Sequence, residues 1–264
     1  MFYSNCKLHT YAINIDLITV KHISKSFSDV QILKDISFVF ETGKTNLIIG
    51  KSGSGKSVLT KCMVGLYEPD HGDIFFDDRK LSALKPKERK QLRREIGMLF
   101  QASALFDSLS VEENVAFPIK MFTKMSKEEI DERVNFCLNR VDIINKNQLY
   151  PCELSGGMQK RVAIARAIAM QPKYLFCDEP NSGLDPVTAI VIDELIQEIT
   201  EEYNMTTIVI THDMNSVLEI GENIMFIDQG ENKWTGSKNE ILDVKVKELH
   251  DFIYVSKFLQ QMKK

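Results

Sequence analysis

The amino-acid sequence predicts an α/β fold built on a largely parallel β-sheet with helices on both faces. Three apolar runs of strand length, at residues 174–177, 206–210 and 224–227, alternate with helical segments, as parallel strands joined by crossover helices do. An earlier apolar run, at residues 47–49, leads through a glycine-rich stretch into another helix. This alternation places the chain in the α/β class.

The 264 residues are enough for one such domain, or for one domain with an inserted subdomain. Residues 17–22, 36–40, 74–76 and 96–100 are further predicted strands. Between residues 101 and 154 the pattern is helical, because Ser110 with Glu113 and Ser126 with Glu129 match the capping box that opens a helix. We therefore expect a helical insert in a continuous globular unit.

Composition argues against several classes of protein. The formal charge of -4 and the pI near 5.8 provide no basic field for nucleic acid. No stretch approaches the roughly 18 apolar residues of a membrane span, and residues 1–16 lack the pattern of a signal peptide. The cysteines are scattered without metal-ligand spacing or a disulfide pattern. They are Cys6, Cys62, Cys137, Cys152 and Cys177.

A phosphate-binding loop lies between the predicted strand at residues 47–49 and the helix that follows. The segment matches the pattern G-x-x-x-x-G-K-[ST], whose glycines let backbone N–H groups close around phosphates at a helix N-terminus. Lys56 is expected to reach the β- and γ-phosphates, and the Ser57 hydroxyl to ligate Mg²⁺. ATP with Mg²⁺ is the predicted ligand. The loop comprises Gly50, Lys51, Ser52, Gly53, Ser54, Gly55, Lys56 and Ser57, followed by Val58.

Two adjacent carboxylates follow the predicted strand at residues 174–177. Asp178 and Glu179 would lie at the carboxyl edge of the sheet, where ligands bind in open parallel sheets. Asp178 is expected to hold Mg²⁺, directly or through water, and Glu179 to polarise or deprotonate the attacking water. Two acids after a strand more often form a solvated strand end, but the phosphate loop makes the catalytic interpretation the stronger one.

A second glycine motif resembles the L-S-G-G-Q signature of ATP-binding cassette (ABC) ATPases, with Met in place of the final Gln. Its serine and glycines at a helix start would form an anion-binding nest, although a capped helix after a glycine turn is the simpler interpretation. The resemblance implies that this nest closes on the γ-phosphate of a second copy, in a head-to-tail dimer. The signature residues are Ser155, Gly156, Gly157, Met158 and Gln159, after Leu154.

The resemblance also implies a fold: a P-loop NTPase with a RecA-like parallel-sheet core, an N-terminal antiparallel β subdomain and an inserted helical subdomain. The ATPase domain would span residues 15–243, with the helical subdomain at about 102–160. Residues 244–264 would form a tail. Leu249, Phe252, Leu259 and Met262 have roughly helical spacing there, which predicts an amphipathic helix that packs on its own domain or braces a partner subunit.

Four further positions match the family's motifs, and their roles are implied by the resemblance. Gln101 resembles the glutamine that senses Mg²⁺ and the nucleophilic water, and also counts as a metal ligand. His212, in Thr211-His212-Asp213, resembles the switch histidine that contacts the γ-phosphate. Phe27 takes the place of the adenine-stacking aromatic. The D-loop that links the two sites across the dimer matches Ser182, Gly183, Leu184 and Asp185, although Asp185 could equally be a helix cap.

Residues 99–118 and 153–158 are most similar to the ATPase of Mla-type, Mce-associated phospholipid transporters. That resemblance implies an integral-membrane permease as partner, an Mce-domain lipid-binding protein as a further one, and a peripheral place on the cytoplasmic face of the bacterial inner membrane. Alternatives are an ABC ATPase for another cargo, such as a lipoprotein, an amino acid, another solute or a toxin. A non-transport ABC ATPase and a degenerate, regulatory cassette are the remaining alternatives.

Overall fold

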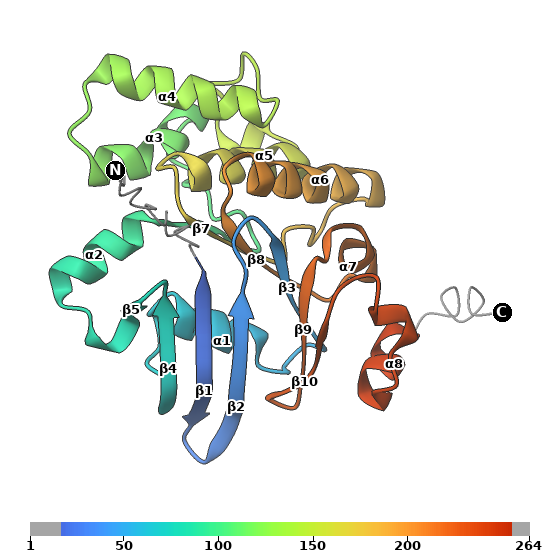
Figure 1. Cartoon of the computed structure of the whole chain (residues 1–264). Coiled ribbons are helices and arrows are strands. Elements are labelled where there is room, and N and C mark those ends of the chain that lie inside the picture. Colours follow the sequence, from blue (N-terminus) through green and yellow to red (C-terminus); the bar gives the residue numbers. More distant parts are fainter. Residues whose placement is uncertain (1–16, 255–264) are drawn as a thin grey trace, which may run out of the picture.

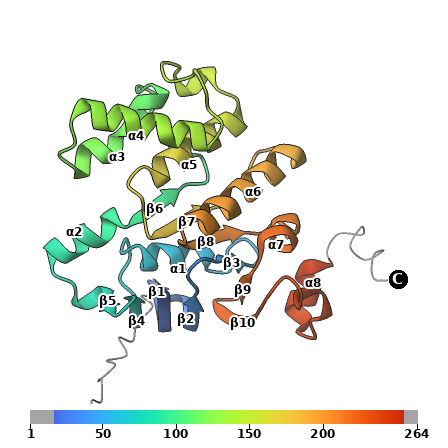
Figure 2. The ribbon, with the colours of Figure 1, turned by 45° about the horizontal axis from the view of Figure 1, so that its top comes forward.

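The computed structural model describes residues 17–254, which form two β-sheets and a lobe of helices (Figure 1). One sheet is antiparallel and the other is mostly parallel, and their strand orders are β2-β1-β4-β5 and β10-β9-β3-β8-β7-β6. Helix α1 (Lys56–Met63) lies between the two sheets (Figure 2). The predicted α/β fold, with its parallel core, antiparallel β subdomain and helical insert, is confirmed.

The antiparallel sheet contains longer strands than the sequence predicts. Strand β1 continues past His22, whose φ of 55° accompanies a shift in the register between Val20 and Ile23. This irregularity interrupts the alternation of buried and exposed residues, so the pattern alone ends the strand too early. The strands are β1 (Ile18–Phe27), β2 (Val30–Phe40), β4 (His71–Phe76) and β5 (Arg79–Lys80).

The parallel sheet is buried on both faces. In β3 every residue is buried, and neighbouring side chains pack into two different cores, with Ile48 in one and Leu47 and Ile49 in the other. Such strands are continuous apolar runs, which is why the sequence revealed them. Strand β10 was missed because it is polar and only half-buried at the sheet's edge. The strands are β3 (Thr45–Ile49), β6 (Ile96–Leu99), β7 (Tyr174–Asp178), β8 (Thr206–Thr211), β9 (Asn223–Asp228) and β10 (Glu231–Gly236).

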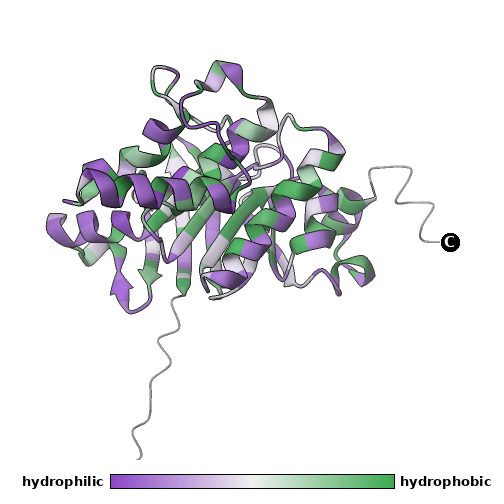
Figure 3. Ribbon diagram, turned by 90° about the horizontal axis from the view of Figure 1, so that it is seen from above, coloured by the Kyte–Doolittle hydropathy of each residue, from purple (hydrophilic) through white to green (hydrophobic). Residues whose placement is uncertain are grey.

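Helices cover both faces of the parallel sheet, as predicted. Helix α1 packs with the antiparallel sheet on one face, while α5 (Gly156–Ile168), α6 (Pro186–Glu202), α7 (Met214–Ile220) and α8 (Lys247–Ile253) share the core of the other. Apolar strands therefore lie inside a shell of mixed helices, as the colouring of Figure 3 shows. Short 3₁₀ helices occur at Leu81–Ala83, Pro151–Glu153 and Ile241–Asp243.

The helical lobe consists of α3 (Val111–Phe122), α4 (Lys127–Arg140) and α5. Both predicted capping boxes are present. The hydroxyl groups of Ser110 and Ser126 accept a hydrogen bond from the backbone N–H three residues later, and the carboxylates of Glu113 and Glu129 accept one from the backbone N–H of the serine. Helix α2 (Pro86–Arg94) was not predicted. Leu92 is its one buried residue, so it has no apolar stripe from which to infer a helix.

The part of the tail within the described residues is helix α8. Leu249 is fully buried, and the Phe252 ring lies 5.5 Å from that of Phe226 on β9. Leu259 and Met262 of the predicted amphipathic helix lie outside the described residues. Among residues 17–254, no helix combines the length and apolar character needed to cross a membrane.

Candidate active site

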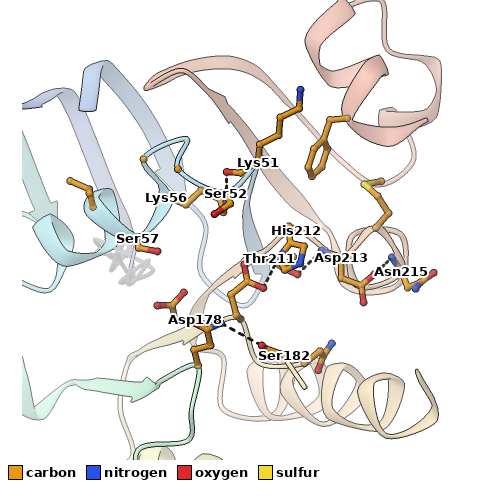
Figure 4. A pocket seen from close by; sticks show the side chains of 18 of the residues that line it. Lys51, Ser52, Lys56, Ser57, Asp178, Ser182, Thr211, His212, Asp213 and Asn215 are labelled. Atoms are coloured by element: carbon orange, nitrogen blue, oxygen red, sulfur yellow. Dashed lines mark hydrogen bonds and ion pairs between the residues drawn. The ribbon is translucent and has the colours of Figure 1, made fainter. Parts of the chain in front are cut away.

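The glycine-rich loop connects β3 to α1 at the carboxyl edge of the parallel sheet (Figure 4). Gly50 has a φ of 148°, and a Cβ there would lie 2.1 Å from the Ile227 carbonyl oxygen. Gly55 has a φ of 111°, and its Cβ would lie 2.8 Å from Leu33 Cδ2. Both positions therefore require glycine. The loop lines a cleft of about 1310 Å³ whose other wall carries Gln101, Asp178, Glu179, Ser182 and His212.

Lys56 is held within the loop and is only 6% exposed. Its Nζ donates hydrogen bonds to the carbonyl oxygens of Gly50 (2.7 Å) and Lys51 (2.9 Å). Because an ammonium group has three protons, one donor remains for a phosphate oxygen. Burial lowers the pKa of Lys56, whereas the charges of Glu179 and Asp178 raise it. The arrangement provides a positioned cation at the phosphate loop.

Oxygen ligands suited to Mg²⁺ line the same cleft. Figure 4 shows Ser57, near the start of α1, and Asp178, at the end of β7, at one end of it. Burial raises the pKa of Asp178 and the neighbouring charge of Glu179 adds to that rise, so a divalent cation would offset an electrostatic conflict already present. Hydroxyl, carboxylate and the Gln101 amide oxygen are hard donors of the kind that Mg²⁺ takes. These residues fit the ion.

Glu179 is brought into contact with His212. Glu179 has a φ of 49°, which is strained for a residue with a side chain, and its backbone N–H donates to the Ile210 carbonyl at 2.9 Å. Its carboxylate lies 2.8 Å from His212 Nδ1. With Nδ1 engaged, Nε2 is the ring nitrogen that remains for a ligand. Strain at the end of β7 thus accompanies a paired acid and histidine facing the cleft.

Gln101 lies just beyond β6, at the edge of the cleft. Its side-chain Nε2 donates to Ser182 Oγ at 3.4 Å, and its carbonyl oxygen accepts from Lys160 Nζ. The glutamine therefore contacts the D-loop segment through its side chain and α5 through its backbone.

The signature residues line a different pocket, of about 750 Å³. Ser155 is the N-cap of α5, and its Oγ accepts from the Met158 backbone N–H at 3.3 Å. The simpler interpretation, a capped helix, is therefore present. The predicted anion nest, which the remaining N–H groups of the first turn would form, stays a prediction. Gln159 lies apart from the pocket lining, because its Nε2 donates to the Pro151 carbonyl at 2.9 Å.

The D-loop segment joins the two pockets. Ser182 lines the first cleft, Leu184 and Asp185 line the second pocket, and Gly183 lines both. Asp185 caps α6: its Oδ1 accepts from the backbone N–H groups of Val187 and Thr188, both at 3.1 Å. Its capping function is thus directly visible.

Phe27 lies at the end of β1 and is not among the described residues that line either pocket. The residue is 41% exposed, and its ring meets that of Tyr67 edge-on, with centroids 5.2 Å apart. Lys25 Nζ lies over the ring, 5.5 Å from its centroid, so a base that stacks on Phe27 would use the opposite face. The predicted adenine contact stays a prediction.

Sequence reasoning missed several residues that lie in these pockets or, like Lys160, outside their linings. Lys160 is buried in α5 although charged, and Asn181 connects Glu179 to the D-loop and donates to Asp193 at 2.7 Å. A signal for Lys160 existed: it shares a helical stripe with Ala163, Ile164 and Ala167, so its position faces the core. The other residues overlooked at the first cleft are Ile32, Met214, Asn215, Leu218, Phe252 and Ile253.

Comparison with known proteins identifies the family. Residues 33–182 match the sequence profile of the ABC transporter family. Methionine import ATP-binding proteins MetN from Clostridium tetani, Clostridioides difficile and Campylobacter jejuni are 42%, 40% and 37% identical over 80%, 85% and 93% of this chain. The chain in turn spans 66%, 70% and 78% of those relatives.

Solved structures agree in fold. The ATP-binding cassette MJ0796, in a dimeric post-hydrolysis state with ADP and Pi, has a TM-score of 0.76 and 32% identity, covering 84% of this chain and 98% of its own. The cassette cbiO1 of Clostridium perfringens, part of the transporter complex cbiONQ, has a TM-score of 0.82 and 31% identity, covering 95% and 100%. The chain belongs to the ABC transporter family, as one of its ATP-binding cassettes.

Proposed function

We propose that this chain is the Mg-ATP-hydrolysing subunit of an ABC transporter and that it works as a head-to-tail dimer. The observation that carries the proposal is the division of the site. Lys56, Ser57 and Glu179 line one pocket, whereas the signature Ser155 and Gly157 line another. A second copy supplies the missing half of each site. The solved dimer of MJ0796 with ADP and Pi supports this arrangement.

Six residues of the cleft have defined tasks in the proposed hydrolysis. Lys56 is placed to bind the phosphates with its remaining N–H. Ser57, Asp178 and Gln101 would hold Mg²⁺, and the ion would supply charge neutralisation at the phosphates. Glu179 polarises the attacking water. His212, oriented by its contact with Glu179, donates to the γ-phosphate from Nε2. The chain is an ATPase.

The proposed partner is an integral-membrane permease, which the dimer contacts through its helical lobe and residues 102–118. No described helix spans a membrane, so the cargo path is assigned to that partner. The chain would lie peripherally on the cytoplasmic face of the bacterial inner membrane. ATP draws the two copies together by filling both interfacial sites, and hydrolysis releases them.

Two cargoes are the candidates. The relatives named above are methionine importers, which favours import of an amino acid or similar small solute, the alternative that the sequence left open. The predicted phospholipid cargo of the Mla type and its Mce-domain partner have no support from these relatives. The phospholipid proposal depends on residues 99–118 and 153–158 alone. Because the permease handles the cargo, neither inference concerns a residue of the ATP site.

The test of function is to purify the chain from native membranes together with its bound partners and to measure phosphate release from ATP. We expect hydrolysis that EDTA abolishes and Mg²⁺ restores. Hydrolysis independent of Mg²⁺, or a complex holding a single copy of the chain, would contradict the proposal.

The same complex decides the cargo. Copurification of a permease with a solute-binding protein, and faster hydrolysis when methionine and that protein are added, would support solute import. An Mce-domain protein together with bound phospholipid would establish lipid transport and exclude methionine.

A further inference from the structure

Helix α5 holds the segment after β6 through two cationic side chains. Lys160 Nζ donates to the Gln101 carbonyl oxygen. Six residues further along the helix, Arg166 donates to the carbonyls of Ser103 and Ala104, both at 2.7 Å. Three backbone carbonyls of residues 101–104 are thus fixed by one helix.

This segment has a conformation that needs external support. Ser103 and Ala104 are consecutive residues in the left-handed region, with φ of 61° and 47°. Such a backbone persists when surrounding contacts over-determine it. Lys160 and Arg166 supply those contacts, so the place of Gln101 depends on α5.

Lys160 is an unusual choice for this task. It is 4% exposed, and none of the carboxylates in the described part of the chain forms an ion pair with it. Burial lowers the pKa of Lys160, while Cys177 and Asp178, at the acidic end of β7, raise it. A buried, unpaired ammonium is costly for folding, and an apolar side chain of similar length would suit this core better. A functional role therefore explains a lysine at this position better than a contribution to stability does.

The two ends of this contact belong to different halves of the dimeric site. Lys160 directly follows the signature residues Ser155 to Gln159 on the same helix. The carbonyl that it holds belongs to Gln101, whose side chain lines the first cleft. A shift of α5 at the signature would therefore reach Gln101 through a single hydrogen bond.

We propose that Lys160 is a positioning residue for Gln101. When the signature end of α5 binds the nucleotide of the partner subunit, Lys160 sets the position of Gln101 in the ATP cleft of its own subunit. This inference depends on the dimeric ATPase proposed above. It assigns the link between the two ATP sites to a buried charge in α5.

The test compares Lys160→Met with wild type in the purified transporter complex. Methionine keeps the length and removes the charge and the donor, so we expect kcat to fall by about 10-fold or more, since small misplacements in an active site have effects of this size. The KM for ATP and the affinity for a fluorescent ATP analogue should stay within about twofold, because Lys160 lies outside the cleft lining. The melting temperature should be unchanged or higher, because a buried charge is gone.

Two companion variants separate positioning from general stability. Lys160→Arg keeps the charge and a donor and should recover part of the lost kcat. Arg133→Met removes a cation that donates to the carbonyls of Ile168 and Ala169, both at 2.9 Å, at the far end of α5. We expect this control to lower the melting temperature and leave kcat near wild type.

A normal kcat in Lys160→Met, or a fall in kcat that simply parallels a fall in melting temperature, would overturn the inference. So would a Lys160→Arg variant no faster than Lys160→Met. Glu179→Gln in the same assay keeps the proposed function separate. If wild type hydrolyses ATP and Glu179→Gln does not, a normal kcat in Lys160→Met contradicts the role of Lys160 and leaves the proposed ATPase function intact.

Discussion

The two pockets of the chain are built in opposite ways. The first cleft gathers charged side chains from the carboxyl ends of β3, β7 and β8, with Lys56, Asp178 and Glu179 among them. The second pocket is formed around a helix start, where Ser155 and Gly157 present backbone N–H groups. One half carries the reacting groups and the other offers neutral donors. Such halves complement each other, and a substitution in either pocket tests this division.

The largest expected effect is on the side that carries reacting groups. In Glu179→Gln the side chain keeps its size but cannot accept a proton from water, so kcat should fall by about 100-fold or more while ATP binding persists. Phosphate release and nucleotide affinity, measured on the purified complex, check both statements. Near-normal turnover would remove Glu179 from the reaction.

The second prediction addresses the division between the pockets. Ser155→Asp keeps a good helix cap but places a negative charge where the nest would meet phosphate, so hydrolysis should be lost. Ser155→Asn, an equally good and neutral cap, is the matched control and should stay active.

Coexpression of Ser155→Asp with Lys56→Ala, which should also be inactive, tests whether the two copies share their sites. A mixed dimer contains one site in which both halves are intact, so coexpression should restore about a quarter of wild-type hydrolysis if the sites act independently. If the two variants remain inactive together, the prediction of independent sites shared between two copies is wrong.

The sequence was sufficient to predict site residues that lie in one contiguous motif. It was insufficient for contacts between residues that are distant along the chain. The phosphate loop, the acid pair after β7 and the capped signature helix are short segments whose spacing alone prescribes their geometry. Lys160 and Gln101 are 59 residues apart, and the contact between them depends on how α5 packs against the end of β6. No local pattern encodes that.

Elements with weak burial were also missed. Helix α2 buries only Leu92, and β10 is polar at the edge of its sheet, so neither has the apolar periodicity that reveals an element. The sequence does not predict the cargo for a different reason. The side chains of the ATP site recognise nucleotide, whichever cargo the permease carries.

The third prediction concerns a buried network that supports the D-loop between the pockets. Asp193 on α6 is 3% exposed and accepts from Asn181 at 2.7 Å, and the Asn181 side chain also donates to Ser216 at 3.0 Å. Burial raises the pKa of Asp193 to about 6, and the charges of Asp213 and Glu219 add to the rise.

The folded state therefore favours the protonated Asp193. The stability from this group is fully present below the unfolded pKa of 3.8 and is lost as the pH rises through about 6. Asp193→Asn cannot ionise, so its stability relative to wild type should increase by about 2 kcal/mol between pH 4 and pH 7.5. Urea midpoints at the two pH values measure this difference. An equal difference at both pH values would contradict the raised pKa.

The smallest expected effect is at Phe27, which lies outside both pocket linings. If its exposed ring stacks on adenine, Phe27→Ala should raise the KM for ATP by about 10-fold or less, with kcat preserved, and Phe27→Tyr should match wild type. If the ring serves only to pack on Tyr67, Phe27→Ala should instead lower the melting temperature and leave KM unchanged. Measuring KM and melting temperature on the same preparation separates these outcomes. A change in KM without a change in stability would add Phe27 to the half of the site that holds the nucleotide.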